Sequence, residues 1–235
     1  MKHKLIMENW RRFVNEAALG FGSGGLSELG DMTFRIENDG GYYTIRALDG
    51  SGSELGYVEL DNSYASDCGI FVTHSEIIDP ESGSFGPFLY DLAIELGSLL
   101  GTGVTSSDSP SGLDDSDSAS SKSYAINVWL YYFNKRADIE KHPISCTKMI
   151  KTRYMPIIKN NAQYKVFPDH ELNYLHKGWN SKIALKDPPE DVQNKVNAIN
   201  HFYRKEPIFL DQLKAMGKLE DTANVLEEGG RQYVK

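Results

Sequence analysis

The chain has 235 residues, of which 40% are apolar and 11% aromatic, and its formal net charge is −8. This content can fill a core, which excludes a chain disordered throughout and predicts one large domain, or one domain with a modest extension. No apolar run reaches the ~18–20 residues that span a bilayer, and no signal peptide is visible, so we expect a soluble protein of the cytoplasm that binds no membrane. The negative charge argues against a nucleic-acid partner for the chain as a whole.

The residue types that bind metals do not gather at metal-binding spacings. Cys68 and Cys146 are the only cysteines, and the histidines show no HExxH or C2H2 spacing. We therefore expect reduced thiols and no metal site. Residues 135–165 contain eight Lys or Arg. This basic segment is either a solvated face or a site for an anionic partner or the phosphates of a cofactor.

Residues 1–30 are predicted to form an amphipathic helix followed by a glycine-rich linker. Apolar residues recur every three or four positions across 4–19, which is typical of a helix with one buried face. Gly20, Gly22 and Gly25 then spell a GxGxxG motif. The dinucleotide-binding motif follows a strand, whereas here a helix precedes it, so we interpret these glycines as a linker.

Residues 31–150 are predicted to form one α+β domain that begins with strands. Four short runs rich in β-branched and aromatic residues occur at 32–38, 42–48, 54–61 and 68–77. Glycine-rich turns separate the first three runs, which predicts an antiparallel meander.

The second half of this domain alternates helices with loops. A loop at 80–86 leads into a helix over 87–101, because Pro87 favours a helix start and Gly101 a helix end. A short strand at 103–107 and an exposed Ser- and Asp-rich loop at 105–123 follow. The next helix ends at Arg136. Its expected apolar face consists of Ala125, Val128, Trp129, Tyr132 and Phe133.

Residues 151–235 are predicted to be a partly helical C-terminal extension. Helices are expected at 190–204 and 206–217, the second with Leu210 and Leu213 buried. Further strands are expected at 144–150 and 163–167.

The order of four strands, loop, helix, strand and helix resembles the core of the GNAT acyltransferase superfamily, over about residues 33–147. In that family the loop after the fourth strand reads Q/R-x-x-G-x-G/A, and its backbone N–H groups hold the pyrophosphate of acyl-CoA at a helix N-terminus. Here the aligned stretch is ESGSFG, residues 81–86, followed by PFL. The resemblance implies a mostly antiparallel central sheet flanked by helices, and acetyl-CoA as the cofactor. The implied cofactor-binding residues are Gly83, Ser84, Phe85, Gly86, Pro87 and Phe88.

The family's second pattern, N-x-x-A-x-x-x-Y, carries a tyrosine that often protonates the leaving thiolate. Ala125 matches this pattern, but Trp129 stands at the tyrosine position, and an indole cannot act as that acid. Tyr131 and Tyr132 are therefore the candidate acids, unless both simply pack in the core.

A general base would deprotonate the acceptor amine. The candidates on the central strands are Glu59, Asp61, His74 and Glu76, and nothing in the sequence selects among them. We carry Glu59 forward as the candidate catalytic base. The alternative for each is a solvated residue on a strand.

The stretches GPFLYDLAIELGSLLGTGVTSSD and SYAINVWLYYFNKRADI also resemble GNAT-like proteins of tailed phages, over about residues 54–145. The N-terminal MKHKLIMENWRRFVNEA resembles leaders that direct phage internal proteins into the prohead. Such leaders end at a Leu/Ile-x-Glu protease site, which residues 6–8 and 26–28 both match. The resemblance implies a location in the host cytoplasm or the virion interior.

Two functions remain open. The first is an N-acyltransferase that uses acetyl-CoA on an amine acceptor. The second is a non-catalytic GNAT-like phage protein that is packaged, structural or host-interacting, with a degenerate CoA cleft and a protein partner for its N-terminal helix. Glu81, Ser84 and Trp129 depart from the family pattern and favour the second.

Overall fold

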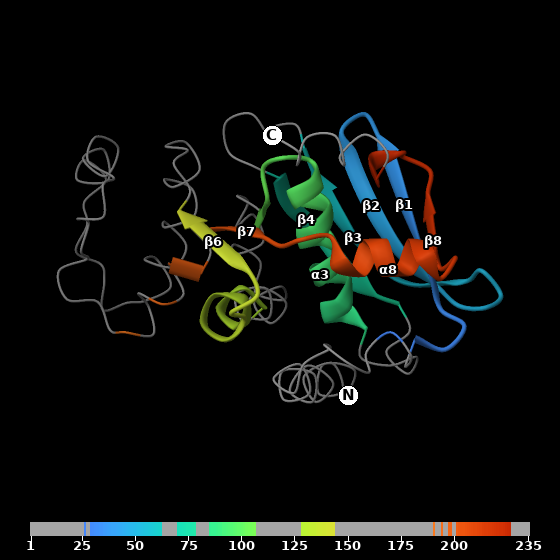
Figure 1. Cartoon of the computed structure of the whole chain (residues 1–235), viewed down its shortest axis with the longest axis horizontal. Helices are drawn as coiled ribbons and strands as arrows, with labels where there is room; N and C mark the ends of the chain where they lie inside the picture. The colour runs from blue at the N-terminus through green and yellow to red at the C-terminus, as the bar shows by residue number, and fades with distance from the viewer. Residues whose placement is uncertain are drawn as a thin grey trace, which may run out of the picture.

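The computed structural model describes residues 26, 29–62, 70–78, 85–106, 128–143, 190, 194, 197–198 and 201–226. These residues form an α+β fold with one eight-stranded mixed sheet, in the order β6-β7-β5-β4-β3-β2-β1-β8 (Figure 1). The strands are β1 (Thr33–Asp39), β2 (Tyr42–Leu48), β3 (Glu54–Asp61), β4 (Ile70–Ile77), β5 (Val104–Ser106), β6 (Glu140–Pro143), β7 (His201–Arg204) and β8 (Leu219–Asp221). The labelled helices are α3 (Gly86–Leu99) and α8 (Ile208–Ala215).

The first four strands form the antiparallel meander that the sequence predicts. The turn between β1 and β2 consists of Gly40 and Gly41, both at positive φ, a conformation that glycine adopts without steric cost. Apolar side chains alternate along these strands and share one core with α3, among them Ile36, Ile45 and Val58. The alternation that predicted the strands therefore also sets which sheet face is buried.

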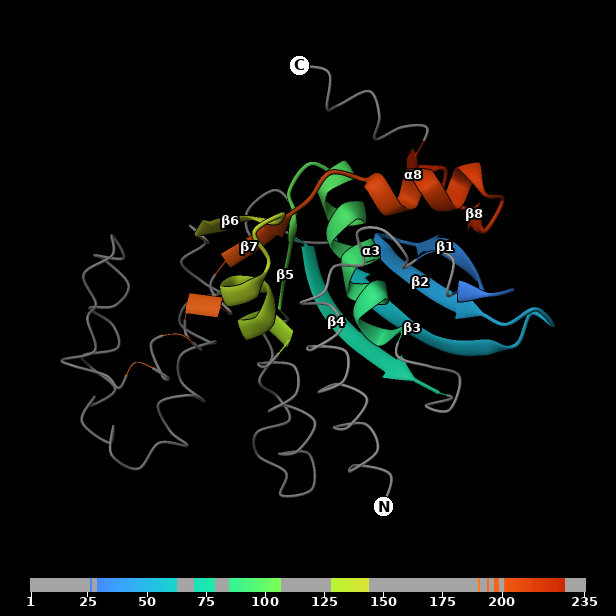
Figure 2. The same cartoon turned by 60° about the horizontal axis from the view of Figure 1, so that its bottom comes forward.

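Helix α3 confirms the helix predicted over 87–101, and it connects β4 to the parallel strand β5. Every residue from Pro87 to Leu99 is buried. Figure 2 shows α3 and α8 on the same face of the sheet. The helix lies so close to β5 that a Cβ on Gly97 would meet Val104 Cγ2 at 2.1 Å. Only glycine fits at this contact.

Strands from the second half of the chain complete the sheet at both ends. β7 lies between β5 and β6, and β8 pairs in parallel with β1 at the opposite edge. The predicted helix over 190–204 is wrong for residues 201–204, because they hydrogen-bond to distant strands and bury Tyr203 completely. The sheet thus takes strands from both sides of the boundary drawn at residue 150.

The remaining elements partly match expectation. The helix predicted over 206–217 is confirmed as α8, and residues 128–135 are helical, with Val128, Trp129 and Tyr132 buried. β6 and β8 were not expected. The predicted helix at 4–19, the glycine linker and the strands at 144–150 and 163–167 lie outside the described residues. Among the described helices, none is long and apolar enough to cross a membrane.

Candidate functional site

The second half of β4 extends beyond β5. β4 pairs with β3 along Phe71–Ile77, but with β5 only through Ile70–Val72. No described strand therefore hydrogen-bonds to Thr73–Ile77 on the β5 side. A strand edge of this kind presents backbone N–H and C=O groups to an extended ligand.

The N-terminus of α3 lies against this edge. A Cβ on Gly86 would lie 3.3 Å from Ile77 Cδ1, and Tyr90 on the second turn of α3 places its hydroxyl 2.8 Å from Ser75 Oγ. Phe85 at the N-cap makes no side-chain capping hydrogen bond. Because a helix leaves its first N–H groups without acceptors inside the helix, this end of α3 favours an anion. The strand edge and the helix N-terminus form one continuous region.

The residues predicted to bind the cofactor divide into three kinds. Gly83 and Ser84 lie outside the described residues. Phe85, Pro87 and Phe88 are buried, and the Phe88 ring packs against Phe34 and Phe209 in the core. Gly86 lies at the start of α3 without a side chain. Here α3 therefore offers a ligand its backbone rather than apolar side chains.

The candidate acids Tyr131 and Tyr132 belong to the helix of residues 128–135, and both are buried. Tyr132 is completely inaccessible, and its hydroxyl donates toward Pro87 O and Asp91 Oδ1, 3.2 Å from each. Burial raises the pKa of Tyr132 well above the ordinary value, and it also raises the pKa of Tyr131. The structure thus brings Tyr132 to Pro87, but inside the core.

Trp129 also lies in the core, where it contacts the rings of Tyr90, Tyr132 and Tyr203. Its exposed fraction is 2%. The residue at the position where the resemblance implies a tyrosine therefore packs the interior of this fold.

The candidate base Glu59 lies on the face of the sheet that points away from α3. Its neighbours Val58 and Leu60 are buried on the α3 side, and side chains alternate along a strand. Glu59 is paired in register with His74 on β4, and the His74 ring stacks on Tyr57 at 5.6 Å. The structure does not bring Glu59 to the two tyrosines. Its role as a base stays a prediction, like those of Asp61, His74 and Glu76.

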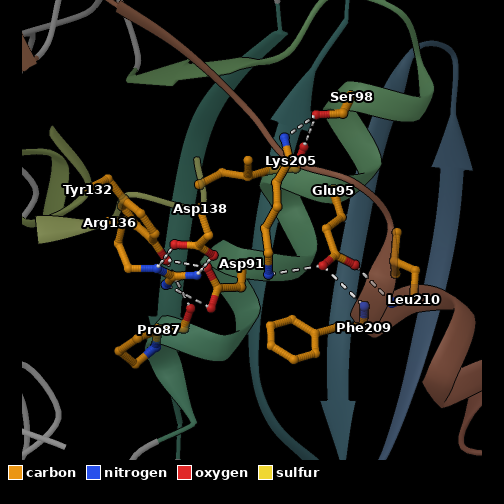
Figure 3. A network of polar contacts seen from close by, with 11 residues as sticks. Pro87, Asp91, Glu95, Ser98, Tyr132, Arg136, Asp138, Lys205, Phe209 and Leu210 are labelled. Atoms are coloured by element: carbon orange, nitrogen blue, oxygen red, sulfur yellow. Dashed lines mark hydrogen bonds and ion pairs between the residues drawn. The ribbon is translucent and has the colours of Figure 1, made fainter. Parts of the chain in front are cut away.

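Two acidic residues of α3 are buried in a polar network that the sequence analysis missed (Figure 3). Asp91 is 1% exposed, and Arg136 Nη1 donates to both of its oxygens at 2.9 and 3.1 Å. Arg136 also donates to both oxygens of Asp138, at 2.8 and 2.7 Å. Burial raises the pKa of Asp91, although the charge of Arg136 opposes this shift. The pair holds the helix of residues 128–135 against α3.

Glu95 lies one turn further along α3 and joins it to the first turn of α8 and to Lys205, which precedes α8. Its carboxylate accepts the backbone N–H groups of Phe209 and Leu210 at 3.1 and 2.8 Å, and Lys205 Nζ lies 3.1 Å away (Figure 3). Burial raises the pKa of Glu95, opposed by Lys205. Acidic residues spaced by four in an otherwise apolar helix were a visible signal, because a buried carboxylate requires partners.

A comparison of the chain with protein-family models, curated proteins and solved structures gives no significant match.

Proposed function

We propose that this protein is a GNAT-like N-acyltransferase that transfers an acetyl group from acetyl-CoA to an amine. The observation that carries the proposal is the edge of Thr73–Ile77, which pairs with no described strand on the β5 side. This edge lies beside the N-terminus of α3, where Phe85 makes no side-chain capping hydrogen bond. The chain order supports it, because β1–β4, α3, β5 and the helix of residues 128–135 follow the order of the family core.

The chemistry of acetyl-CoA fits the two parts of this region. Its pantetheine arm is extended and contains amide groups, which suit hydrogen bonds to a strand edge such as Thr73–Ile77. Its pyrophosphate is anionic, which suits the N-terminus of α3. Gly86 has no side chain that could stand between its backbone and a phosphate, and its Cβ direction is already filled by Ile77, whose Cδ1 would lie 3.3 Å from a Cβ. When bound, acetyl-CoA would supply an acyl group activated as a thioester.

Isothermal titration with acetyl-CoA tests the proposal through Gly86. Gly86→Asp places a negative charge at the helix N-terminus, whereas Gly86→Asn adds a side chain of the same shape without the charge. We expect saturable binding by the wild type and affinity at least about tenfold lower for Gly86→Asp than for Gly86→Asn. No binding at millimolar acetyl-CoA, with a folded protein by circular dichroism, would reject the proposal.

A second candidate function has an observation of its own. Trp129, Tyr131 and Tyr132 are all buried, so the helix that carries the family's acid serves as core packing here. This favours a non-catalytic GNAT-like phage protein, packaged or host-interacting, with a protein partner for its N-terminal segment. Absence of acetyl-CoA binding would favour this candidate.

A further inference from the structure

One hydrogen bond connects the core to the exposed edge of β4. Ser75 Oγ and the Tyr90 hydroxyl lie 2.8 Å apart, and either atom can be the donor. The Tyr90 residue is only 9% exposed, and its ring packs edge-on against Trp129 at 5.9 Å. Ser75, in contrast, is an exposed residue within the part of β4 that pairs with no described strand on the β5 side. The pair therefore links a buried phenol to the surface beside the N-terminus of α3.

The hydroxyls of Tyr132 and Tyr203 have partners of a different kind. Tyr132 donates to Pro87 O and Asp91, and Tyr203 donates to the backbone carbonyls of Trp129 and Ala198. A carbonyl oxygen accepts a hydrogen bond but has no proton to return. A serine hydroxyl both donates and accepts, so a proton can move along the Tyr90–Ser75 pair in either direction.

We propose that Ser75 and Tyr90 form the proton donor for the departing thiolate, replacing the tyrosine that the family carries at the position of Trp129. This inference rests on the proposed acyltransferase function. Ser75 is the catalytic residue, because it lies on the edge that would hold the thioester arm. Tyr90 acts through Ser75.

The step balances in atoms and charge. The amine nitrogen forms a bond to the acyl carbon, and the carbon–sulfur bond breaks with its electron pair going to sulfur. Sulfur takes the Ser75 proton, and Ser75 takes the Tyr90 proton. The amine nitrogen loses its proton to solvent, and solvent returns one to Ser75 as Ser75 returns its own to Tyr90.

The acid–base state of Tyr90 is consistent with this role. Burial raises the pKa of Tyr90, and the hydrogen bond from Ser75 opposes that shift. The phenol is therefore protonated at neutral pH and has a proton to deliver.

The test separates binding from turnover. Acetyl-CoA affinity is measured by titration, and CoA release is measured with a thiol-reactive dye, using spermidine as the amine. We expect Ser75→Ala and Tyr90→Phe to retain acetyl-CoA affinity within about twofold and to lower kcat about 100-fold. Ser75→Thr keeps a hydroxyl and restores most of the rate. Tyr42→Phe, the same change at an exposed tyrosine, is the control.

Each outcome decides a different point. Unchanged kcat in both Ser75→Ala and Tyr90→Phe would overturn the inference while leaving the proposed function intact. Acetyl-CoA binding without thiol release above the uncatalysed rate would overturn the inference and leave a binding cleft. The wild-type rate should fall at alkaline pH, where the phenol of Tyr90 loses its proton. Absence of this fall in Tyr90→Phe, together with activity in Ser75→Thr, would support the inference, because a purely structural role of Tyr90 would not change the pH dependence.

Discussion

Glu95 accepts the backbone N–H of Leu210 at 2.8 Å, although the two residues are 115 positions apart. The carboxylate of one helix thereby caps the start of another. An N-cap side chain normally performs this task from within the same helix, but Pro207 precedes α8 and makes no such bond. The start of α8 is therefore fixed by tertiary structure.

Glu95→Gln is expected to lower the free energy of unfolding by about 3 kcal/mol, because it leaves the Lys205 ammonium buried without its counter-ion. Urea denaturation measures this loss. Lys205→Met in the same background removes the orphaned charge, so the double variant should be more stable than Glu95→Gln alone. Equal stability of the single and double variants would show that Lys205 without Glu95 does not destabilise the fold, which would contradict the stated reason for the loss.

Arg136 and Asp91 should differ in their tolerance of substitution. Arg136→Met leaves the 1%-exposed Asp91 without its cation, at a cost of about 3–5 kcal/mol. Asp91→Asn leaves Arg136 paired with Asp138, and we expect a cost of about 1–2 kcal/mol. Denaturant titration of both variants compares the costs. The reverse order would mean that the Asp138 pair contributes nothing once Asp91 is neutral.

His201 makes stability depend on pH. Burial lowers the pKa of His201, helped by Lys141 and His142 on β6 and opposed by the hydrogen bond to Asn197 O. The folded state therefore resists protonation, so this contribution to stability is present above the ordinary value of 6.5 and is lost as pH falls through the lowered pKa. Melting temperatures between pH 5 and 7.5 should fall less steeply with acid in His201→Gln than in the wild type. The exposed His74→Gln variant serves as the control, and parallel curves for His201→Gln and wild type would contradict the assignment.

Gly97→Ala is expected to be destabilising by about 1–3 kcal/mol, even though alanine favours helix. The added Cβ would overlap Val104 Cγ2, which lies 2.1 Å from the Cβ position. Val104→Ala in the same variant should recover part of the loss, as thermal unfolding can show. Gly86→Ala adds the same methyl group at the start of α3, where the nearest atom is 3.3 Å away, and should be close to neutral.

Local sequence patterns predicted the elements that are determined by residues close to one another in the chain. The meander follows from alternation and glycine turns, and α3 from its apolar run. β7 was not predicted, because the four residues HFYR become a strand only through partners on β5 and β6. β6 reads EKHP and lies at a sheet edge, where a strand needs hydrogen bonds but little burial, so its polar sequence resembles a loop.

The same distinction between local patterns and distant contacts applies to the candidate site. The position of Gly86 at the start of a helix followed from the sequence, since Pro87 marks a helix start. The Ser75–Tyr90 contact did not, because it joins a strand to a helix and depends on where α3 crosses the sheet. Asp91 and Glu95 were visible as acids in an apolar helix, but their partners Arg136 and Lys205 are set by the packing of later segments.

The position of β7 between β5 and β6 has a consequence for biosynthesis. A nascent chain completes β1–β5 and β6 long before residues 201–204 leave the ribosome. During that interval the edge of β5 lacks the strand that covers it in the finished sheet. Unpaired strand edges in incomplete chains are sites of aggregation. Translation pauses that hold residues 201–204 inside the ribosome should therefore increase aggregation or chaperone engagement.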